Sequence, residues 1–514
     1  MSLIRKYWEE KPLFVILFLG IFFRLIAVIF SKGWGMQDDH FLIIEQAQAW
    51  SEGLNYNNWF PDSHGSPQPD GHSIFYAGLH FLFFLFCGFL HFDDPQAKMY
   101  LIRFFHAAFS LITVYYGYRL TEKLAGKESA KLSGLLLSIF WIMPFLSVRN
   151  LVEFVCIPFM MGGLWYIYKA KESQGNVNYY LLAGVIMGVG FSIRFQTAIF
   201  ISGTAIALLF LKQWKPVFIF SIGVLLSIVL LQGIIDYFIW GYPFAEAIEY
   251  IRYNMAAAHS YITGPWYLYL LLLAGILIPP VSIFMFVGYF RVWKKHLLIF
   301  LPVLIFLLFH SIFPNKQERF ILPVVPFIII LGVIGWVGYV KKSEFWNRYP
   351  VLLRSCWAFF WIINTVGLFA VTPMYSKKAR VESMVYLSRY KNIGCILQED
   401  IYHSGMPLMP MYYLSQWVGA GMITNEQTQE VYAKQLRYVI KKRYPHFVLF
   451  FGSENLKQRV NKVQKLLPEI VYETTIKPGF IDDLLYRLNP RNSNQTIIIY
   501  RNTEFFPDKI SSTP

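Results

Sequence analysis

Residues 12–50 read PLFVILFLGIFFRLIAVIFSKGWGMQDDHFLIIEQAQAW, and this stretch decides the fold. Its first part, residues 12–30, is an apolar run long enough to cross about 30 Å of hydrocarbon. An acidic pair, Asp38 and Asp39, follows at the far boundary of that run. The apolar run is preceded by three basic residues, Arg5, Lys6 and Lys11. Because basic loops stay on the inner side of a membrane, the stretch predicts a first span running from inside to outside.

The composition of the chain extends this interpretation to most of its length. Of 514 residues, 56% are hydrophobic and only 15% are charged, against about 25% charged in soluble domains. A soluble protein of this length needs more polar surface than that. The 19% aromatic share excludes disorder, and four cysteines exclude a disulfide scaffold. The sequence therefore predicts a polytopic membrane protein.

Charge is distributed unevenly and divides the chain into two parts. Residues 1–373 are about 12% charged, whereas residues 374–514 are about 22% charged. We therefore predict a transmembrane domain at 1–373 and a soluble domain at 374–514. Short apolar runs alternate with amphipathic stretches in the second part, which predicts a small α/β domain. The net charge of +15 is shared almost evenly between the parts, which argues against nucleic-acid binding.

The loops between the apolar runs set the topology. Their Lys and Arg clusters all fall on one side of the membrane only if the run at 74–91 does not cross, so we predict a re-entrant or surface-lying segment there. The N-terminus is then inside and the soluble domain outside. Eleven spans are expected, at 12–30, 99–120, 128–146, 151–168, two within 179–211, and at 215–235, 266–290, 296–313, 320–340 and 351–373.

With this topology the unusual polar residues collect on the outer face. Asp38 or Asp39 is suited to act as a general base on an incoming hydroxyl, and Glu45 lies seven residues past Asp38, on the same face of a helix. The plainer alternative is a pair of solvated loop acids. Lys316 and Arg319 break the positive-inside trend, and such cations suit a phosphate group. Snorkelling to lipid headgroups is their alternative.

Three further charged residues lie at outer turns. Arg194 interrupts a 33-residue apolar run, which by default marks a site or a buried pair. Arg149 and Glu153 are spaced for a simple i, i+4 pair. The scattered histidines lack the spacing of a zinc site, and no nucleotide-binding motif is present. We therefore expect no metal or other cofactor.

In order, these residues resemble the GT-C membrane glycosyltransferases, and among them the family 22 mannosyltransferases that use dolichol-phosphate-mannose. Asp38, Asp39 and Glu45 match an acidic motif of the first outer loop. The most specific match is the family's H-K-E-x-R-F, here N-K-Q-E-R-F with Asn315 and Gln317 as departures. The other matches are HSIFYAG at 72–78, SVRNLVE at 147–153, RFQTA at 194–198, DYFIWG at 236–241, Asn254 and YITGPWYLY at 261–269.

The resemblance implies a GT-C fold and an inverting sugar transfer, most simply of mannose, from a polyprenyl-phosphate donor to a glycan or glycolipid acceptor. It makes Asp38 or Asp39 the base, with Asp38 preferred. Lys316 and Arg319 bind the donor phosphate, with Arg149 and Arg194 as second choices. The residues it assigns to substrate binding are Glu45, His72, Glu153, Asp236, Asn254, Trp266, Asn315 and Glu318.

Two other functions remain open at this point. A transporter or flippase of lipid-linked sugars shares the membrane setting and needs no base, and a non-catalytic membrane scaffold needs neither base nor cations. Short loops favour a prokaryotic plasma membrane over the endoplasmic reticulum, with the active site and residues 374–514 outside the cytoplasm. The expected partners are the lipid donor, the acceptor and membrane lipid.

Overall fold

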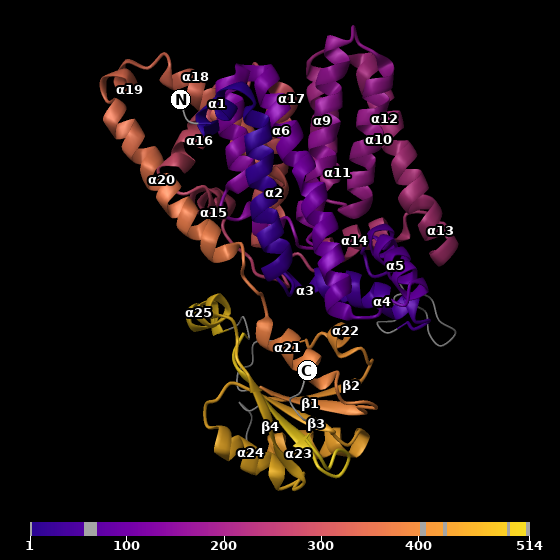
Figure 1. The fold of residues 1–514 in the computed structure, drawn as a ribbon. Coiled ribbons are helices and arrows are strands. Elements are labelled where there is room, and N and C mark those ends of the chain that lie inside the picture. Colours follow the sequence, from indigo (N-terminus) through magenta and orange to yellow (C-terminus); the bar gives the residue numbers. More distant parts are fainter. Residues whose placement is uncertain (1–2, 56–68, 401–407, 425–428, 491–493, 510–514) are drawn as a thin grey trace. The chain divides into compact units, whose positions relative to one another are not determined.

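The structure is a computed structural model that describes residues 3–55, 69–400, 408–424, 429–490 and 494–509 (Figure 1). It divides into two compact units, each of which is described by itself. Unit 1 comprises residues 1–29, 57–83 and 100–373. Unit 2 comprises residues 30–56, 84–99 and 374–514. Unit 2 thus includes the acidic stretch after the first apolar run, which the charge distribution alone assigns to the membrane domain.

Unit 1 is built from helices. They are α1 (Leu3–Glu10), α2 (Pro12–Phe30), α5 (Ile74–Phe89), α6 (Pro95–Ile139), α7 (Met143–Leu146), α8 (Val152–Val155), α9 (Ile157–Glu172), α10 (Val177–Ile193), α11 (Thr197–Phe210), α12 (Trp214–Ile228), the π-helix η2 (Val229–Gly233), α13 (Ile234–Trp240), α14 (Ala245–Ala256), α15 (Leu268–Ile276), α16 (Val281–Arg291), α17 (Leu297–Ile312), the 3-10 helix η3 (Glu318–Val324), α18 (Val325–Val340), α19 (Glu344–Arg348) and α20 (Pro350–Val371). Three of them, α2, α5 and α6, begin or end in unit 2, and α2 does so only by its last residue, Phe30.

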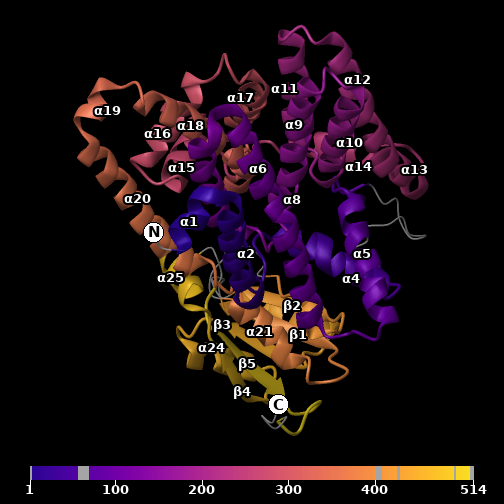
Figure 2. The same ribbon diagram turned by 45° about the horizontal axis from the view of Figure 1, so that its top comes forward.

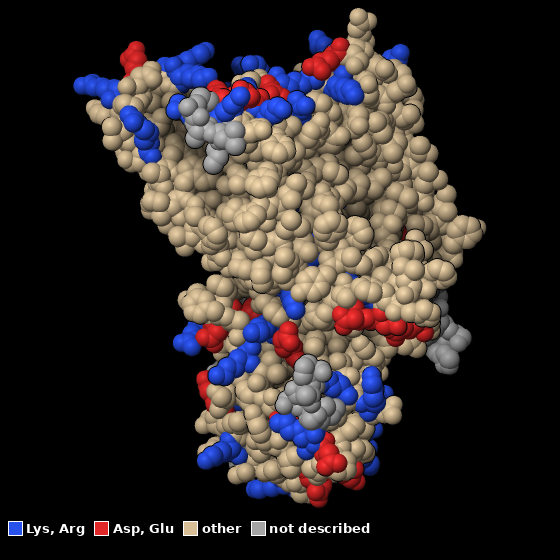
Figure 3. Space-filling model, in the orientation of Figure 1, with Lys and Arg blue, Asp and Glu red and all other residues tan. Residues whose placement is uncertain are grey.

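Five helices among the described residues are long and apolar enough to cross a membrane. They are Pro12–Phe30, Pro95–Ile139, Trp214–Trp240, Glu318–Val340 and Pro350–Val371. Figure 3 shows a broad band of unit 1 without Lys, Arg, Asp or Glu, and charged residues gathered at the end that holds α1 and α19. This distribution is typical of helices that meet lipid along their length and water at their ends.

Several predicted spans differ from the helices that the structure contains. The single span expected at 266–290 is two helices, α15 and α16, bent by 118° at a break that contains Pro279 and Pro280. Proline lacks an N–H and clashes with the preceding turn, which explains the break. The spans expected at 99–120 and 128–146 correspond to two successive helices within α6, which meet at a kink at Gly126, although the second of them ends at Ile139 and not at residue 146. The 16 residues of α5 extend about 24 Å, less than a full crossing.

Glycines let the helices of unit 1 approach closely. A Cβ on Gly288 of α16 would lie 2.0 Å from the carbonyl oxygen of Gly332 in α18, and one on Gly184 of α10 would lie 2.1 Å from that of Phe220 in α12. Helices pack in lipid by van der Waals contact, so small residues at the crossings are what brings them together. Figures 1 and 2 show α9, α10 and α12 side by side. The most buried span, Glu318–Val340, is 89% buried.

Unit 2 contains a five-stranded mixed sheet with strand order β2-β1-β3-β5-β4. Strands β2, β1 and β3 are parallel to one another, and β5 runs antiparallel to both β3 and β4. Its elements are α3 (Gln37–Asp39), the π-helix η1 (His40–Glu45), α4 (Gln46–Ser51), α21 (Lys378–Leu387), β1 (Cys395–Asp400), α22 (Met411–Leu414), β2 (Gly419–Thr424), α23 (Gln429–Lys442), β3 (Phe447–Phe451), α24 (Leu456–Gln464), β4 (Ile470–Ile476), α25 (Phe480–Leu488) and β5 (Ile497–Asn502). The predicted α/β character of the tail is therefore confirmed.

A buried ion pair fastens α24 to the sheet of unit 2. The Arg459 guanidinium donates to the Glu399 carboxylate at the end of β1 and to the carbonyl oxygen of Gly452 at 2.9 Å. Arg459 is 1% exposed and Glu399 is fully buried. A pair this deep has exchanged hydration for mutual attraction, so neither partner tolerates loss of the other.

A second buried contact in unit 2 joins the first outer loop to the tail. Glu45 Oε1 accepts the backbone N–H of Tyr412 at 3.0 Å, and the ring of His40 is stacked between Trp34, 4.9 Å away, and Tyr413, 5.5 Å away. Burial raises the pKa of Glu45 to about 8, while hydrogen bonds from the backbone of Tyr412 oppose that rise. Burial lowers the pKa of His40 to about 3. Both groups are therefore neutral at pH 7.

Loss of the buried ion pair should destabilise unit 2. We expect Arg459→Met to cost about 3–5 kcal/mol, because Glu399 is left buried without its counter-charge. Limited proteolysis of the full chain, combined with thermal unfolding, measures this. Arg487→Met is the matched control, since the Arg487–Asp483 pair is exposed. Equal protease resistance of the two variants would contradict the prediction.

The raised pKa of Glu45 predicts a pH-dependent stability. A carboxyl whose pKa rises from 4.5 to about 8 on folding contributes stability that is complete below about pH 4.5 and is lost as the pH rises through about 8. Glu45→Gln, which cannot ionise, should therefore lose less stability than the native chain between about pH 6 and pH 9. Thermal unfolding at both pH values measures the difference. Parallel pH profiles of the two proteins would show that Glu45 does not titrate this way.

Candidate active site

The centre of the candidate site in unit 1 is the carboxylate of Glu153. It is fully buried in α8, and its Oε1 lies 3.0 Å from Nη2 of Arg194 and 3.3 Å from Nε of Arg319. One carboxylate thus contacts two guanidinium groups from sequence positions far apart. A single negative charge between two positive charges leaves a net positive charge in a largely buried place.

Local backbone breaks place these three side chains. Glu153 is in a four-residue helix that follows a turn at 147–151. Arg194 ends α10 with extended backbone angles, and Thr197 begins α11 three residues later. Arg319 is in the 3-10 helix η3, directly before α18. Each charged residue is therefore at a helix end, where the chain turns and its side chain meets the others.

Glutamines also contact the two arginines. Arg194 donates from Nη2 to Oε1 of Gln196 at 2.9 Å, and Arg319 donates from Nε to Oε1 of Gln317 at 2.9 Å. Both glutamines are two residues from the arginine they contact. Gln317 is one of the two departures from the family motif, and here it accepts a hydrogen bond where an acid would add charge.

Unlike the two arginines, Lys316 contacts backbone carbonyl groups. Its ammonium donates to the carbonyl oxygens of His310, Ser311 and Phe313 at 2.6, 2.7 and 2.5 Å, so its three hydrogens are directed to the end of α17. A cation that donates to the last carbonyl groups of a helix also interacts favourably with the negative end of the helix dipole. Lys316 as a phosphate ligand remains a prediction, and it would require these bonds to be exchanged.

The matched motifs at 261–269 and 315–320 lie against each other. Asn315 pairs with Thr263 in an isolated antiparallel bridge, and the N–H of Lys316 donates to the carbonyl of Ile262 at 2.8 Å. Asn315 is buried, whereas Glu318 is exposed and Trp266 is 64% exposed. This bridge brings together two motifs of the predicted site whose bridged residues, Thr263 and Asn315, are 52 positions apart.

Arg149 is buried beside the same turn as Glu153. It is 2% exposed, and its guanidinium carbon lies 4.3 Å from the ring centre of Phe145. The neighbouring Asn150 accepts hydrogen bonds through Oδ1 from Tyr76, at 3.2 Å, and contacts Nε2 of His80 at 3.1 Å. The SVRNLVE motif thus contributes a buried cation and a hydrogen-bonded amide to this part of unit 1.

Glu246, which no sequence motif indicated, is the central residue of a buried acidic cluster. It contacts Asp236 and the backbone of His72, two residues of the predicted site. Glu246 Oε2 accepts the backbone N–H groups of Gly71, at 2.7 Å, and of His72, at 3.1 Å. The carboxylate of Asp236 in turn accepts the N–H of Glu246 at 3.0 Å. Burial raises the pKa of Glu246 to about 8. These acids fix the loop at 69–73 on α14.

Tyr250 is a second residue that sequence reasoning missed. Its ring lies 5.4 Å from that of Phe195, edge to face, and its pKa is raised by burial while the nearby Arg194 opposes the rise. It is one helical turn past Glu246 on α14, and Asn254, one turn further, donates to the Tyr250 carbonyl at 2.8 Å. The i, i+4 spacing of Glu246, Tyr250 and Asn254 was the signal available in the sequence.

The acidic pair lies in unit 2. Asp38 is half-buried and Asp39 is 2% exposed, both in the short helix α3. The π-helix η1 separates them from Glu45, so the α-helical i+7 relation expected between Asp38 and Glu45 does not hold. A π-helix adds a residue to the turn and rotates the residues after it, and such segments often occur at functional sites.

An apolar pocket of about 410 Å³ in unit 1 opens next to the Glu153 turn. Its lining includes Val155 and Ile193, which lie within two residues of Glu153 and Arg194. The other lining residues are Tyr76, Leu79, His80, Phe83, Ile102, Phe105, His106, Phe109 and Phe159. In the described part of the chain, no three His, Cys, Asp or Glu side chains are grouped to hold a metal ion.

Solved structures show what fold this arrangement belongs to. ArnT from Cupriavidus metallidurans bound to undecaprenyl phosphate aligns with 96% of this chain and 98% of its own length, with a TM-score of 0.59 and 12% identity. The archaeal oligosaccharyltransferase AglB from Archaeoglobus fulgidus, in complex with an inhibitory peptide and a dolichol-phosphate, aligns with 92% of this chain and 74% of its own, with a TM-score of 0.51 and 11% identity. The predicted GT-C fold is thereby confirmed.

Similar sequences point to one enzyme family. Human alpha-1,2-mannosyltransferase ALG9 is 27% identical over 226 residues, which are 40% of this chain and 36% of that protein. GPI mannosyltransferase 3 of Kluyveromyces lactis is 26% identical over 207 residues, which are 36% of this chain and 33% of that protein. The matched region thus spans about a third of each relative. Residues 13–399, well over half of the chain, match the model of the Alg9-like mannosyltransferase family, and this integral membrane protein therefore belongs to that family.

Proposed function

We propose that the protein transfers mannose from a polyprenyl-phosphate donor to a hydroxyl of a glycan or glycolipid acceptor, with inversion at the anomeric carbon, on the outer face of a membrane. The observation that carries this proposal is the Glu153 carboxylate between Arg194 and Arg319. Membership of the Alg9-like family supports the sugar and the reaction class. The lipid phosphates named with ArnT and AglB support the kind of donor.

The cations act where charge develops. When the acceptor oxygen attacks the anomeric carbon, the bond from that carbon to the phosphate oxygen breaks, and the leaving phosphate gains negative charge. Arg194 and Arg319, already held by Glu153, present fixed donors to that charge, so little reorganisation is needed during the reaction. Arginine suits this role because its planar fork matches phosphate oxygens. The remaining net positive charge of the cluster favours the phosphate over a neutral ligand.

The acids take the proton. In the proposed mechanism Asp38, or its neighbour Asp39, removes the proton of the acceptor hydroxyl as the new glycosidic bond forms. Asp38 is the better candidate because it is half-buried, whereas Asp39 is 2% exposed. A metal ion is not needed in this mechanism, since two guanidinium groups meet the phosphate charge.

The apolar pocket next to Glu153 suits the first isoprene units of the donor. Phenylalanines and aliphatic residues supply most of its lining, and its volume of about 410 Å³ is within the range of ligand sites. An isoprenoid chain seated there would bring its terminal phosphate to the turn that carries Glu153. The donor lipid and its phosphate are then recognised by adjacent parts of unit 1.

Substitution of the base tests the mechanism. We expect Asp38→Asn to lower kcat by about 10²–10⁴-fold, because the amide cannot accept the proton. The measurement is transfer of labelled mannose from polyprenyl-phosphate-mannose to a panel of acceptors by the purified protein, with released polyprenyl phosphate quantified. Asp39→Asn is the matched variant and should lose less. Full activity of both variants would exclude the acidic pair as the source of the base.

Substitution of the arginines tests the phosphate site. We expect Arg319→Met and Arg194→Met each to lower kcat by about 10²–10³-fold, the usual cost of losing one donor to a developing anion. Single-turnover kinetics with saturating donor separate this effect from donor binding. Arg291→Met, which removes an arginine at the end of α16, is the control. Native kcat in either cluster variant would remove the cluster from the reaction.

A further inference from the structure

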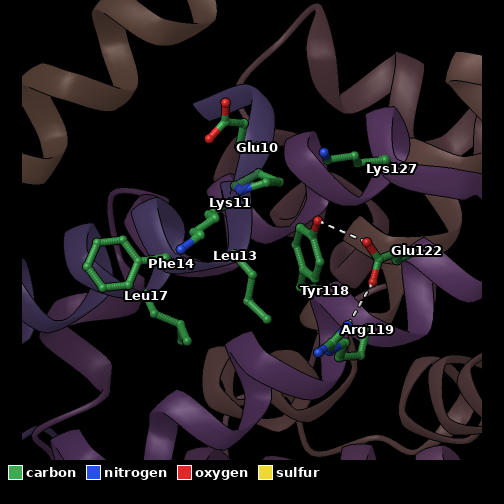
Figure 4. A pocket seen from close by; sticks show the side chains of 10 residues that line it. Glu10, Lys11, Leu13, Phe14, Leu17, Tyr118, Arg119, Glu122 and Lys127 are labelled. Carbon is green, nitrogen blue, oxygen red and sulfur yellow. Dashed lines mark hydrogen bonds and ion pairs between the residues drawn. The ribbon is translucent and has the colours of Figure 1, made fainter. Parts of the chain in front are cut away.

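A second pocket lies in unit 1 where α1, α2 and α6 meet (Figure 4), and nothing in the proposed reaction uses it. Its volume is about 460 Å³. Figure 4 shows Glu10 and Lys127 on one side, Leu17 on the opposite side, and Leu13 beside Tyr118 between them. Its lining is Glu10, Lys11, Pro12, Leu13, Phe14, Leu17, Tyr118, Arg119, Glu122 and Lys127.

The pocket is remote from the Glu153 cluster. Lys123 of α6 pairs with Glu172 at the end of α9, with Nζ 2.6 Å from Oε2, so the part of α6 that lines the pocket lies at that end of α9. Glu153 precedes the other end of α9. The 16 residues of α9 extend about 24 Å, which separates the two places by most of a bilayer's hydrocarbon thickness.

The kink of α6 and a contact between α6 and α1 lie beside the pocket. The helical course of α6 is interrupted at Gly126, which has φ of +80°, so that Lys127 begins a new direction. Lys131, one turn further, pairs with Glu9 of α1 at 2.6 Å and with Glu128 at 3.0 Å. The pair with Glu9 joins α1 to the second part of α6, and α2 starts at Pro12.

The charges in the pocket are only partly matched. Glu122 accepts hydrogen bonds from Tyr118 and Arg119, each at 3.2 Å, so Arg119 neutralises it. Lys127 donates to the main-chain carbonyl of Glu9. Across the described residues, neither Lys11 nor Lys127 has a carboxylate within ion-pair distance. Two ammonium groups thus line one pocket, and the charge of Glu9 acts on Lys127 from beyond ion-pair distance.

The wall beneath these charges is apolar and faces outward. Phe14 is 62% exposed, and Leu13 and Leu17 are partly buried next to it on α2. Since α2 is long and apolar enough to cross a membrane and begins at Pro12, the pocket is at the level where headgroups meet acyl chains. Basic pockets between membrane helices are known to bind phospholipid headgroups.

We propose that this pocket binds one membrane glycerophospholipid, with its phosphodiester against Lys11 and Lys127 and its acyl chains along Leu13, Phe14 and Leu17. The recognised group is the phosphodiester, which zwitterionic and anionic lipids share. Glu10, which also lines the pocket, suits the ammonium of an ethanolamine headgroup and is unfavourable to a headgroup without one. The bound lipid fills the space between α1, α2 and α6 and thereby holds the N-terminal helices on α6.

Lipid retention tests this site without any sugar transfer. The purified full chain is delipidated in detergent, titrated with phosphatidylethanolamine or phosphatidylglycerol, and examined by native mass spectrometry and thermal unfolding. One tightly bound lipid and a rise in Tm are expected for the native chain. Lys11→Gln/Lys127→Gln should weaken lipid binding by about tenfold or more. Lys294→Gln/Lys295→Gln removes the same charge at two exposed lysines and should bind as the native chain does.

Three results would overturn the proposal. Equal lipid binding by the pocket variant and its control would exclude the two lysines. Stabilisation by inorganic phosphate alone, without retention of either lipid, would assign the pocket to a soluble phosphate. Phe309 is an exposed phenylalanine on α17, away from the pocket lining. If Phe14→Ser and Phe309→Ser lose lipid to the same extent, only the general lipid-facing surface is involved. Preference for phosphatidylethanolamine that disappears in Glu10→Gln would support the placement of the headgroup.

Discussion

The buried carboxylate of Glu153 is the constraint on which the candidate site in unit 1 depends. Charged groups in a membrane protein are costly unless they pair, and two arginines without an anion between them would repel each other. One fully buried carboxylate offsets that repulsion and leaves the cluster positive. Three helix ends must come together for this contact to form, which ties the packing of α8, α10 and η3 to the chemistry.

The close helix crossings serve the same arrangement. In lipid, the hydrophobic effect does not drive helices together, so their association depends on van der Waals contact. The absence of a side chain at Gly184 and Gly288 lets the helix backbones approach closely enough to make that contact. These crossings fix α10 against α12 and α16 against α18. Arg194 at the end of α10 and Arg319 in η3, which leads directly into α18, then have defined positions. Long flexible side chains lose less entropy when their backbones are already held.

The sequence was most informative where charge is scarce. Because a charged residue in an apolar run needs a reason, Arg194, Arg319 and Glu153 stood out before their contacts were known, and the mixed α/β tail followed from its alternating pattern. Spacing was less reliable. The i+7 relation of Asp38 and Glu45 assumed an α-helix, and the π-helix η1 between them breaks it. The bend between α15 and α16 and the contact that joins Asn315 to Thr263 depend on tertiary structure that no local pattern records.

For Glu45 and Glu246, burial and not residue type decides what the acid can do. Glu45 and Glu246 have pKa values raised to about 8, so they are protonated at pH 7 and serve as hydrogen-bonding groups that hold neighbouring backbone. A general base must be ionised when substrate arrives, which excludes an acid that is neutral for this reason. Of the acidic pair, Asp38 is half-buried and Asp39 is buried, so Asp38 is the more accessible of the two. The argument for Asp38 as the base therefore rests on its environment as well as on its place in the motif.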